Sequence, residues 1–138
     1  MKKNIELTQE DRNSLVKYRI ERAKETLAEA NILINDNFNN AAMNRLYYAC
    51  YYAVIALLIK NKINAQTHQG VIQMFSLHFV VTEKIDKSFS TFYGKLFKHR
   101  ISGDYDDYVV YKKELLLELR PQAELFIKKI EELTLENK

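Results

Sequence analysis

"LYYACYYAVIALLI", residues 46–59, is the longest apolar run without a charge in this 138-residue chain. A membrane span needs about 20 apolar residues, so this run suits a buried core helix better. The wider segment 39–61 is apolar nearly all round, which is the pattern of a helix that is covered on most sides. We therefore expect a central helix over about residues 39–61, with the other helices packed around it.

The segment before this run also has helical spacing. Thr8 stands three residues before an acid, Asp11, which is typical of a capped helix start. Apolar residues then recur every three or four positions and predict a long first helix to about Asn35. This stripe consists of Leu15, Ile20, Ala23, Leu27, Ala30 and Ile34.

Three further helices are expected after the central one. Thr67 caps a short third helix, a fourth covers about residues 88–101, and a fifth runs to about Leu135. Gly103 is the expected end of the fourth helix, because glycine commonly terminates helices. Pro121 lies inside the fifth helix and is expected to kink or interrupt it.

The composition fits long helices joined by short loops. The chain has three glycines and one proline, and such scarcity favours helices over tight turns. Hydrophobic residues make up 47% and charged residues 28%, as in ordinary globular proteins. We expect a single domain, residues 1–138, with an all-α fold: an antiparallel four- to five-helix up-and-down bundle.

The charge and the cysteine content set weak limits on function. The formal net charge of +3 permits an acidic partner or a nucleic acid but does not require one. Cys50 is the single cysteine, so a disulfide within the chain is impossible. The lysines near the N-terminus are not followed by an apolar secretory segment, so we expect a cytoplasmic protein without a membrane anchor.

The histidines do not form a metal site in the sequence. The chain has no glycine-rich phosphate loop, no HExxH motif and no cysteine cluster. His68, His78 and His99 fall in separate elements without the i, i+4 spacing of metal ligands. We therefore expect neither a metal ion nor a cofactor. His68 is expected to cap a helix or lie on the surface, and His99 to point inward and bond a backbone group.

The tyrosine-rich segment "NRLYYACYYA", residues 44–53, is the first binding candidate. On a helix Arg45, Tyr48 and Tyr52 share one face. A buried arginine needs an acid, and Asp104 is the expected partner. Two interpretations stay open: the Arg45–Asp104 pair joins two helices, or the tyrosines and arginines line a groove that binds a nucleotide or RNA by base stacking and phosphate contacts.

The second candidate is "FKHRISGDYDDYVVYKK", residues 97–113. Lys95, Lys98, His99 and Arg100 concentrate positive charge at the end of the fourth helix. Such a helix end would suit a phosphate, but cations near a helix C-terminus are also favourable without any ligand. Both interpretations are kept.

Three segments, "AAMNRLYYACYYAVIALL", "THQGV" and "R-x-x-G-D-Y", together resemble the HEPN domain family of higher eukaryotes and prokaryotes, in particular its small stand-alone prokaryotic members. The resemblance extends over about residues 10–130. It implies a helical bundle that commonly dimerises and works in RNA cleavage or nucleotide binding, with many toxins and defence components among its members. It also implies a minimal nucleotidyltransferase as a possible neutralising partner.

Ribonuclease members of that family carry an Arg followed, after four to six residues, by a His. The resemblance places Arg100 at the motif arginine, but Tyr105 stands in the place of the histidine and no His follows His99. A phenol with a pKa near 10 is a poor general base at neutral pH. Asp104, Tyr105 and Tyr108 match a "D-Y" variant of the small members.

Three hypotheses follow. The first is a HEPN-like homodimer without the full ribonuclease motif that binds a nucleotide, RNA or a nucleotidyltransferase. Its ligand-binding candidates are Arg100, Asp104, Tyr105, Tyr108, Arg45, Tyr48 and Tyr52. The second is a metal-independent ribonuclease toxin of a toxin–antitoxin pair, in which Arg100 stabilises phosphate charge and Tyr105 or His99 carries the proton. The third is an interaction module whose polar corner is only structural.

Overall fold

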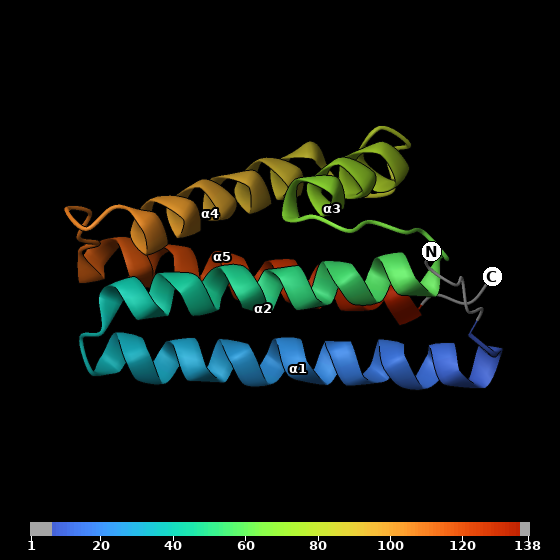
Figure 1. Ribbon diagram of the computed structural model, residues 1–138, viewed down its shortest axis with the longest axis horizontal. Helices are drawn as coiled ribbons and strands as arrows, with labels where there is room; N and C mark the ends of the chain where they lie inside the picture. Colours follow the sequence, from blue (N-terminus) through green and yellow to red (C-terminus); the bar gives the residue numbers. More distant parts are fainter. Residues whose placement is uncertain (1–6, 136–138) are drawn as a thin grey trace, which may run out of the picture.

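The computed structural model describes residues 7–135, which fold into helices (Figure 1). The five α-helices are α1 (Gln9–Asn35), α2 (Asn39–Lys60), α3 (His68–Phe75), α4 (Lys87–Tyr105) and α5 (Lys113–Leu135). A short π-helix, η1 (Ser76–Val80), continues α3. Strands are absent from the described residues, which confirms the all-α prediction.

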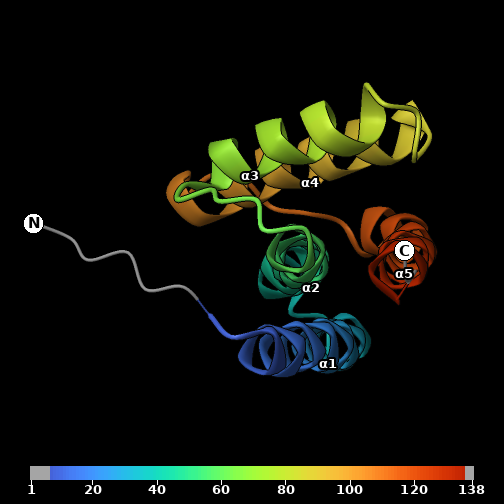
Figure 2. The same ribbon diagram turned by 90° about the vertical axis from the view of Figure 1, so that its right-hand side faces the viewer.

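The four long helices alternate in direction along the chain (Figure 1). The helices α1, α2, α4 and α5 form the up-and-down bundle, while α3 and η1 lie in the connection between α2 and α4. Seen from its end, α2 occupies the middle: α1 lies on one side, α5 on a second, and the α3–α4 pair on a third (Figure 2). The fourth side of α2 is left open.

Burial along α2 confirms the predicted central helix. Half of its 22 residues are buried, including Tyr47 and Cys50, which are fully enclosed. Among the described residues, α2 is the one helix whose length and composition would let it cross a membrane, and 61% of its most apolar window is buried inside the protein. A core helix of a soluble bundle passes the same test.

Two helix starts follow the predicted capping. The Thr8 side chain accepts a hydrogen bond from the Asp11 backbone N–H at 3.0 Å. The Thr67 hydroxyl accepts one from the Gly70 N–H at 2.9 Å. Each cap satisfies a backbone donor that a helix start would otherwise leave unpaired.

The prediction that Gly103 ends the fourth helix was wrong, because α4 continues to Tyr105. The backbone φ angle of Gly103 is not in the left-handed region. A Cβ atom at this position would lie 2.9 Å from Cε2 of Tyr111, so packing, not termination, requires a glycine here.

Pro121 does not interrupt the last helix, because α5 runs continuously across it. Pro121 is exposed, and Leu117, whose carbonyl loses its usual partner, is 42% exposed. On the solvent side water can replace the missing hydrogen bond, which makes the proline tolerable.

Candidate functional site

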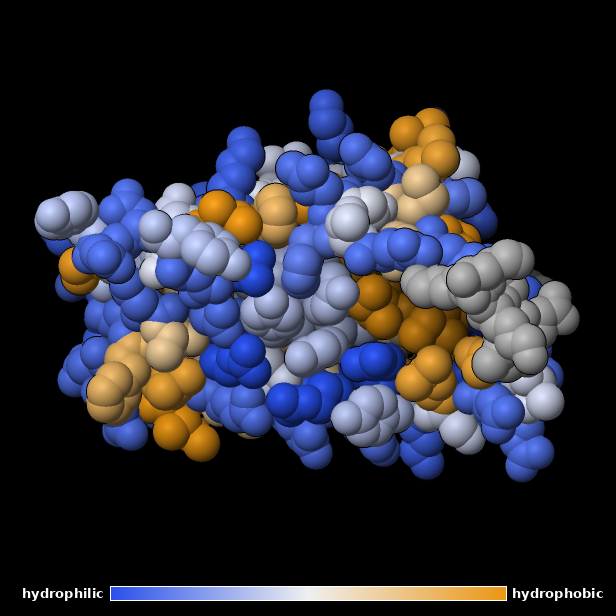
Figure 3. All heavy atoms as spheres, viewed as in Figure 1, coloured by the Kyte–Doolittle hydropathy of each residue, from blue (hydrophilic) through white to orange (hydrophobic). Residues whose placement is uncertain are grey.

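Three half-buried tyrosines lie in mutual contact on α2: Tyr48, Tyr51 and Tyr52, which we call the tyrosine face. Their ring centroids are separated by 5.7 Å (Tyr48–Tyr51), 5.8 Å (Tyr51–Tyr52) and 6.0 Å (Tyr48–Tyr52). Figure 3 shows weakly coloured side chains in the middle of the side that α2 leaves open, with blue ones bordering them and orange patches toward both ends. Tyr47 lies beneath, fully buried.

Two arginines border the tyrosine face on its α1 side. The Arg22 guanidinium carbon lies 5.5 Å from the Tyr52 ring centroid, and that of Arg45 lies 5.2 Å from the Tyr48 centroid. Both fit cation–π contacts, which are strongest for guanidinium groups over aromatic faces. Their side chains keep 28% and 27% exposure, so they are reachable from solvent.

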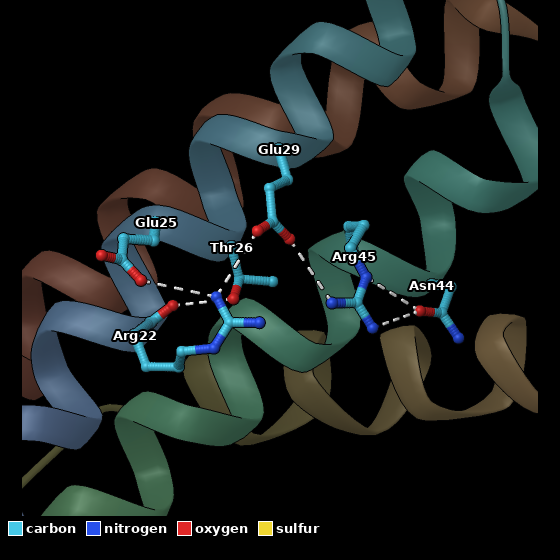
Figure 4. A network of polar contacts seen from close by, with 6 residues as sticks. All are labelled: Arg22, Glu25, Thr26, Glu29, Asn44 and Arg45. Carbon is cyan, nitrogen blue, oxygen red and sulfur yellow. Dashed lines mark hydrogen bonds and ion pairs between the residues drawn. The ribbon is translucent and has the colours of Figure 1, made fainter.

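Glu29 of α1 stands between these two arginines (Figure 4). One of its carboxylate oxygens lies 3.5 Å from Arg22 and the other 3.5 Å from Arg45. One half-exposed acid therefore holds two guanidinium groups at the edge of the tyrosine face. An anionic ligand would have to compete with this carboxylate for both of them.

The predicted Arg45–Asp104 pair was wrong, because Asn44 stands between the two side chains. Arg45 donates through Nε and Nη2 to Asn44 Oδ1 at 3.1 and 2.8 Å. The amide nitrogen of Asn44 donates to Asp104 Oδ2 at 3.1 Å. The acidic partner of Arg45 is thus Glu29 on the neighbouring helix α1, and not Asp104.

Arg100 borders the tyrosine face on its α4 side and joins α4 to α2. Its Nη2 donates to the Tyr48 hydroxyl at 2.8 Å. Its Nε lies 3.2 Å from Asp104 Oδ2, an ion pair whose angle falls short of a hydrogen bond. The guanidinium carbon lies 5.6 Å from the Tyr47 centroid and 5.3 Å from that of Tyr48. With 11% of its side chain exposed, Arg100 is largely enclosed by these contacts.

His68, expected to cap a helix or lie on the surface, is the half-buried first residue of α3 and lies against the tyrosine face. Its Nδ1 is 2.7 Å from the Tyr47 hydroxyl, and its ring centroid is 4.6 Å from that of Tyr51. Its ring is also stacked with that of Phe97, with 6.3 Å between the centroids. Burial, together with the positive charge of Arg100, lowers the pKa of His68 below its usual value.

The corner after α4 is pinned by Tyr111, which is 7% exposed. Its hydroxyl donates to the His99 carbonyl at 2.5 Å, and its backbone N–H donates to Asn40 Oδ1 at 3.0 Å. Asn39 in turn donates to the Tyr111 carbonyl at 3.0 Å. Tyr108, three residues earlier, is by contrast 94% exposed.

His99 turns inward, as predicted, but its ring makes no hydrogen bond to a backbone group. The ring meets Tyr111 edge-on at 5.4 Å, and within the described residues its Nε2 is buried without a hydrogen-bond partner. Burial, reinforced by the charge of Lys95, lowers the pKa of His99.

Five of the seven predicted ligand-binding residues come together around the tyrosine face: Arg45, Tyr48, Tyr52, Arg100 and Asp104. Tyr105 and Tyr108 stand apart from them, with 72% and 94% of their surface exposed. The sequence reasoning missed Glu29, Tyr51 and His68 as members of the site. The "THQGV" segment was the one signal that could have pointed to His68.

Residues 7–135 contain no group of three or more His, Cys, Asp or Glu side chains that could hold a metal ion. Cys50 is fully buried, and burial raises the pKa of its thiol far above the usual range. The groups available at the site are therefore phenols, guanidinium groups, one imidazole and the carboxylates of Glu29 and Asp104 that pair with the arginines.

A sequence model of the HEPN domain matches residues 16–133 of this chain. The chain belongs to the HEPN domain family. In this HEPN chain the candidate site lies on α2 and on the facing parts of α1, α3 and α4, all inside the matched residues.

Several relatives in other organisms are similar over most of this HEPN chain. A "UPF0332 protein" of Thermotoga maritima is 35% identical over 123 residues, which is 89% of this chain and 93% of that protein. "Putative toxin MJ0142" of Methanocaldococcus jannaschii is 33% identical and covers 80% of this chain and 75% of its own length. "Putative toxin MJ0605" of the same organism is 36% identical over 86 residues, 62% of this chain and 64% of that protein.

Proposed function

We propose that this HEPN protein binds single-stranded RNA on the tyrosine face. The observation behind the proposal is the contact between three half-buried tyrosine rings and arginines on both of their borders. Single-stranded nucleic acids are held by aromatic rings, on which bases stack, and by guanidinium groups, which pair with phosphates. Free nucleotides also contain a base and a phosphate. They are expected to bind more weakly than RNA, because they make fewer phosphate contacts.

The relatives support a toxin-type role for such a protein. Two of them, both from Methanocaldococcus jannaschii, carry the name "Putative toxin". A protein that captures cellular RNA would be toxic by interfering with translation or RNA turnover. Toxicity itself is tested by expressing the chain and comparing growth with a variant that lacks RNA binding.

Binding without efficient cleavage is the form of the proposal that the geometry favours. Arg100 is 11% exposed and already engaged by Tyr48 and Asp104. Tyr105 is 72% exposed, and among the described residues it makes no hydrogen bond or ring contact with Arg100. The His99 ring faces Tyr111 instead. The proton carriers named in the ribonuclease hypothesis are thus not presented to a phosphate beside Arg100 within one chain.

The test is fluorescence anisotropy with a labelled single-stranded RNA of 12 nucleotides. Tyr52→Ala removes one stacking ring and should weaken binding by about 1–3 kcal/mol, roughly five- to 150-fold. Arg22→Gln should weaken it as well and lower the salt dependence by about one phosphate contact. Lys128→Gln makes the same charge change on α5, on the far side of α2 from the open face, and serves as the matched control. Equal affinity of all three variants and the native protein would refute the proposal.

A homodimer, or a complex with a minimal nucleotidyltransferase, is proposed to use the corner between α4 and α5. Tyr105, Tyr108 and Val110 expose 72%, 94% and 80% of their surface within six residues of chain. Such clustered exposed apolar side chains mark interaction surfaces. Self-association is tested by sedimentation of the native protein and of a variant with Tyr105→Ser, Tyr108→Ser and Val110→Ser. The variant should be monomeric at concentrations where the native chain is a dimer.

A further inference from the structure

The His68 ring contacts three neighbouring side chains, and one of its two nitrogens is not used by any of them. Its Nδ1 is used by the Tyr47 hydroxyl at 2.7 Å, and its ring centroid lies 4.6 Å from that of Tyr51 and 6.3 Å from that of Phe97. Within the described residues Nε2 of His68 makes no hydrogen bond. Unlike Nε2 of His99, it is not buried. The free nitrogen of His68 therefore reaches solvent at the border of the tyrosine face.

The ring proton of His68 is assigned with the Tyr47 phenol as the donor of their hydrogen bond. Burial raises the pKa of Tyr47 far above its usual value, so the phenol keeps its hydrogen. That hydrogen needs an acceptor, and the short contact to His68 Nδ1 supplies it. Nδ1 of a neutral His68 then accepts, and the ring proton sits on Nε2 as an outward-facing donor.

Arg100 offers a second free donor beside the same rings. The His68 ring centroid lies 5.7 Å from that of Tyr47 and 5.8 Å from that of Tyr48, and the Arg100 guanidinium lies over both. Nη2 of Arg100 is used by Tyr48 and Nε faces Asp104. Nη1 has no hydrogen bond within residues 7–135, and it is not buried, so it can donate to a ligand.

We propose that His68 Nε2 and Arg100 Nη1 together bind one phosphate group of the RNA at the α3–α4 border of the tyrosine face, and that His68 takes up a proton as the phosphate binds. The inference rests on the proposed function and adds a site, a ligand group and a pH response to it. An imidazole and a guanidinium that both lie against the rings of Tyr47 and Tyr48 present the charge and the N–H donors that a phosphate diester accepts. Tyr47 is a positioning residue, because it acts through the ring of His68.

The charges around His68 explain the proton uptake. From α4 it faces Arg100, from α2 it faces the neutral phenols of Tyr47, Tyr48 and Tyr51, and α3 itself has no other titratable group. Without a ligand, burial and Arg100 favour the neutral imidazole. A phosphate placed between the two groups offsets the charge of Arg100 and stabilises the imidazolium. The added proton sits on Nδ1 and is donated to the Tyr47 oxygen, while the phenol hydrogen of Tyr47 turns to the neighbouring Tyr93 hydroxyl, whose oxygen has no other partner within the described residues. Affinity should therefore rise as the pH falls, by at most about tenfold per pH unit for one proton.

The experiment is an NMR titration of the histidine side chains from pH 8 to pH 5 with no ligand, with the 12-nucleotide RNA, and with inorganic phosphate. The RNA should raise the pKa of His68, and the resonances of His78, on η1, serve as the reference. His68→Gln should weaken RNA binding at pH 6 by about five- to tenfold and remove the pH dependence, whereas His78→Gln should do neither. Tyr47→Phe keeps the buried ring and should reduce the shift of His68 while the protein stays folded.

The outcomes separate this inference from the proposed function. If Tyr52→Ala weakens RNA binding but His68→Gln leaves affinity and pH profile unchanged, the RNA-binding face stands and the His68 site is overturned. If RNA binds to none of the proteins and inorganic phosphate still raises the pKa of His68, the phosphate site stands and the RNA ligand is overturned. If neither ligand moves the pKa of His68, the inference fails altogether.

Discussion

Two glycines of α4 allow the same substitution to be tested in opposite environments. Both Gly94 and Gly103 lie inside the helix, where alanine is intrinsically more stable than glycine by about 0.8–1.0 kcal/mol. A Cβ atom at Gly94 meets nothing within 4 Å, whereas at Gly103 it lies 2.9 Å from Tyr111 Cε2. Gly94→Ala should therefore raise the free energy of unfolding by about 0.5–1 kcal/mol.

At Gly103 the packing cost opposes the helix gain. Tyr111 is pinned by its hydroxyl, its N–H and its carbonyl, so its ring has little freedom to withdraw from a new methyl group. Overpacking of this kind costs about 1–3 kcal/mol. After the helix gain, Gly103→Ala should change stability by between about zero and 2 kcal/mol in the destabilising direction, so the two variants should differ by about 1–3 kcal/mol.

Urea unfolding followed by circular dichroism measures the difference, and thermal melts should separate the two variants by several degrees. The control is a double-mutant cycle: in a Tyr111→Ala background the clash is gone, and Gly103→Ala should become neutral or stabilising. If Gly103→Ala is as stable as Gly94→Ala in the native background, the Tyr111 contact does not explain the glycine, and the account of this corner is wrong.

Three further expectations concern the electrostatics and the core. Glu29→Gln frees the two arginines that share this acid, so RNA affinity at about 100 mM salt should increase by roughly two- to fivefold in the anisotropy assay; weaker binding would contradict competition between Glu29 and phosphate. His68 and His99 both have a lowered pKa in the folded state, so the stability that they contribute is present above the unfolded pKa of about 6.5 and is lost as the pH falls; urea unfolding at pH 7.5 and pH 5 should show this loss, and His99→Gln should reduce it. Cys50 should react with a thiol reagent only as fast as the protein unfolds, and rapid labelling of the native protein would place it outside the core.

The sequence was sufficient for the fold because the decisive patterns are local. The apolar run 46–59 marked the central helix, and Thr8 and Thr67 marked two helix starts within one residue. Spacing along one helix also placed Arg45, Tyr48 and Tyr52 together, since three- and four-residue steps return to the same side.

Contacts between helices were harder to predict, because they depend on how each helix is rotated about its axis. The pairing of Arg45 with Glu29 and the contact of His68 with Tyr47 join residues whose positions in the sequence give no sign of their proximity. Gly103 was misread for a related reason: its role is set by Tyr111, eight positions later on another segment, and not by the local backbone.

The amide of Asn44 has a direction that its surroundings enforce. Arg45 can only donate and therefore faces the amide oxygen, while the Asp104 carboxylate can only accept and therefore faces the amide nitrogen. Rotating the amide by half a turn would break both contacts at once. Deamidation would do more, because the group facing Asp104 would become a second carboxylate. The chemical ageing of a single side chain would then set like charges against each other at the junction of α2 and α4.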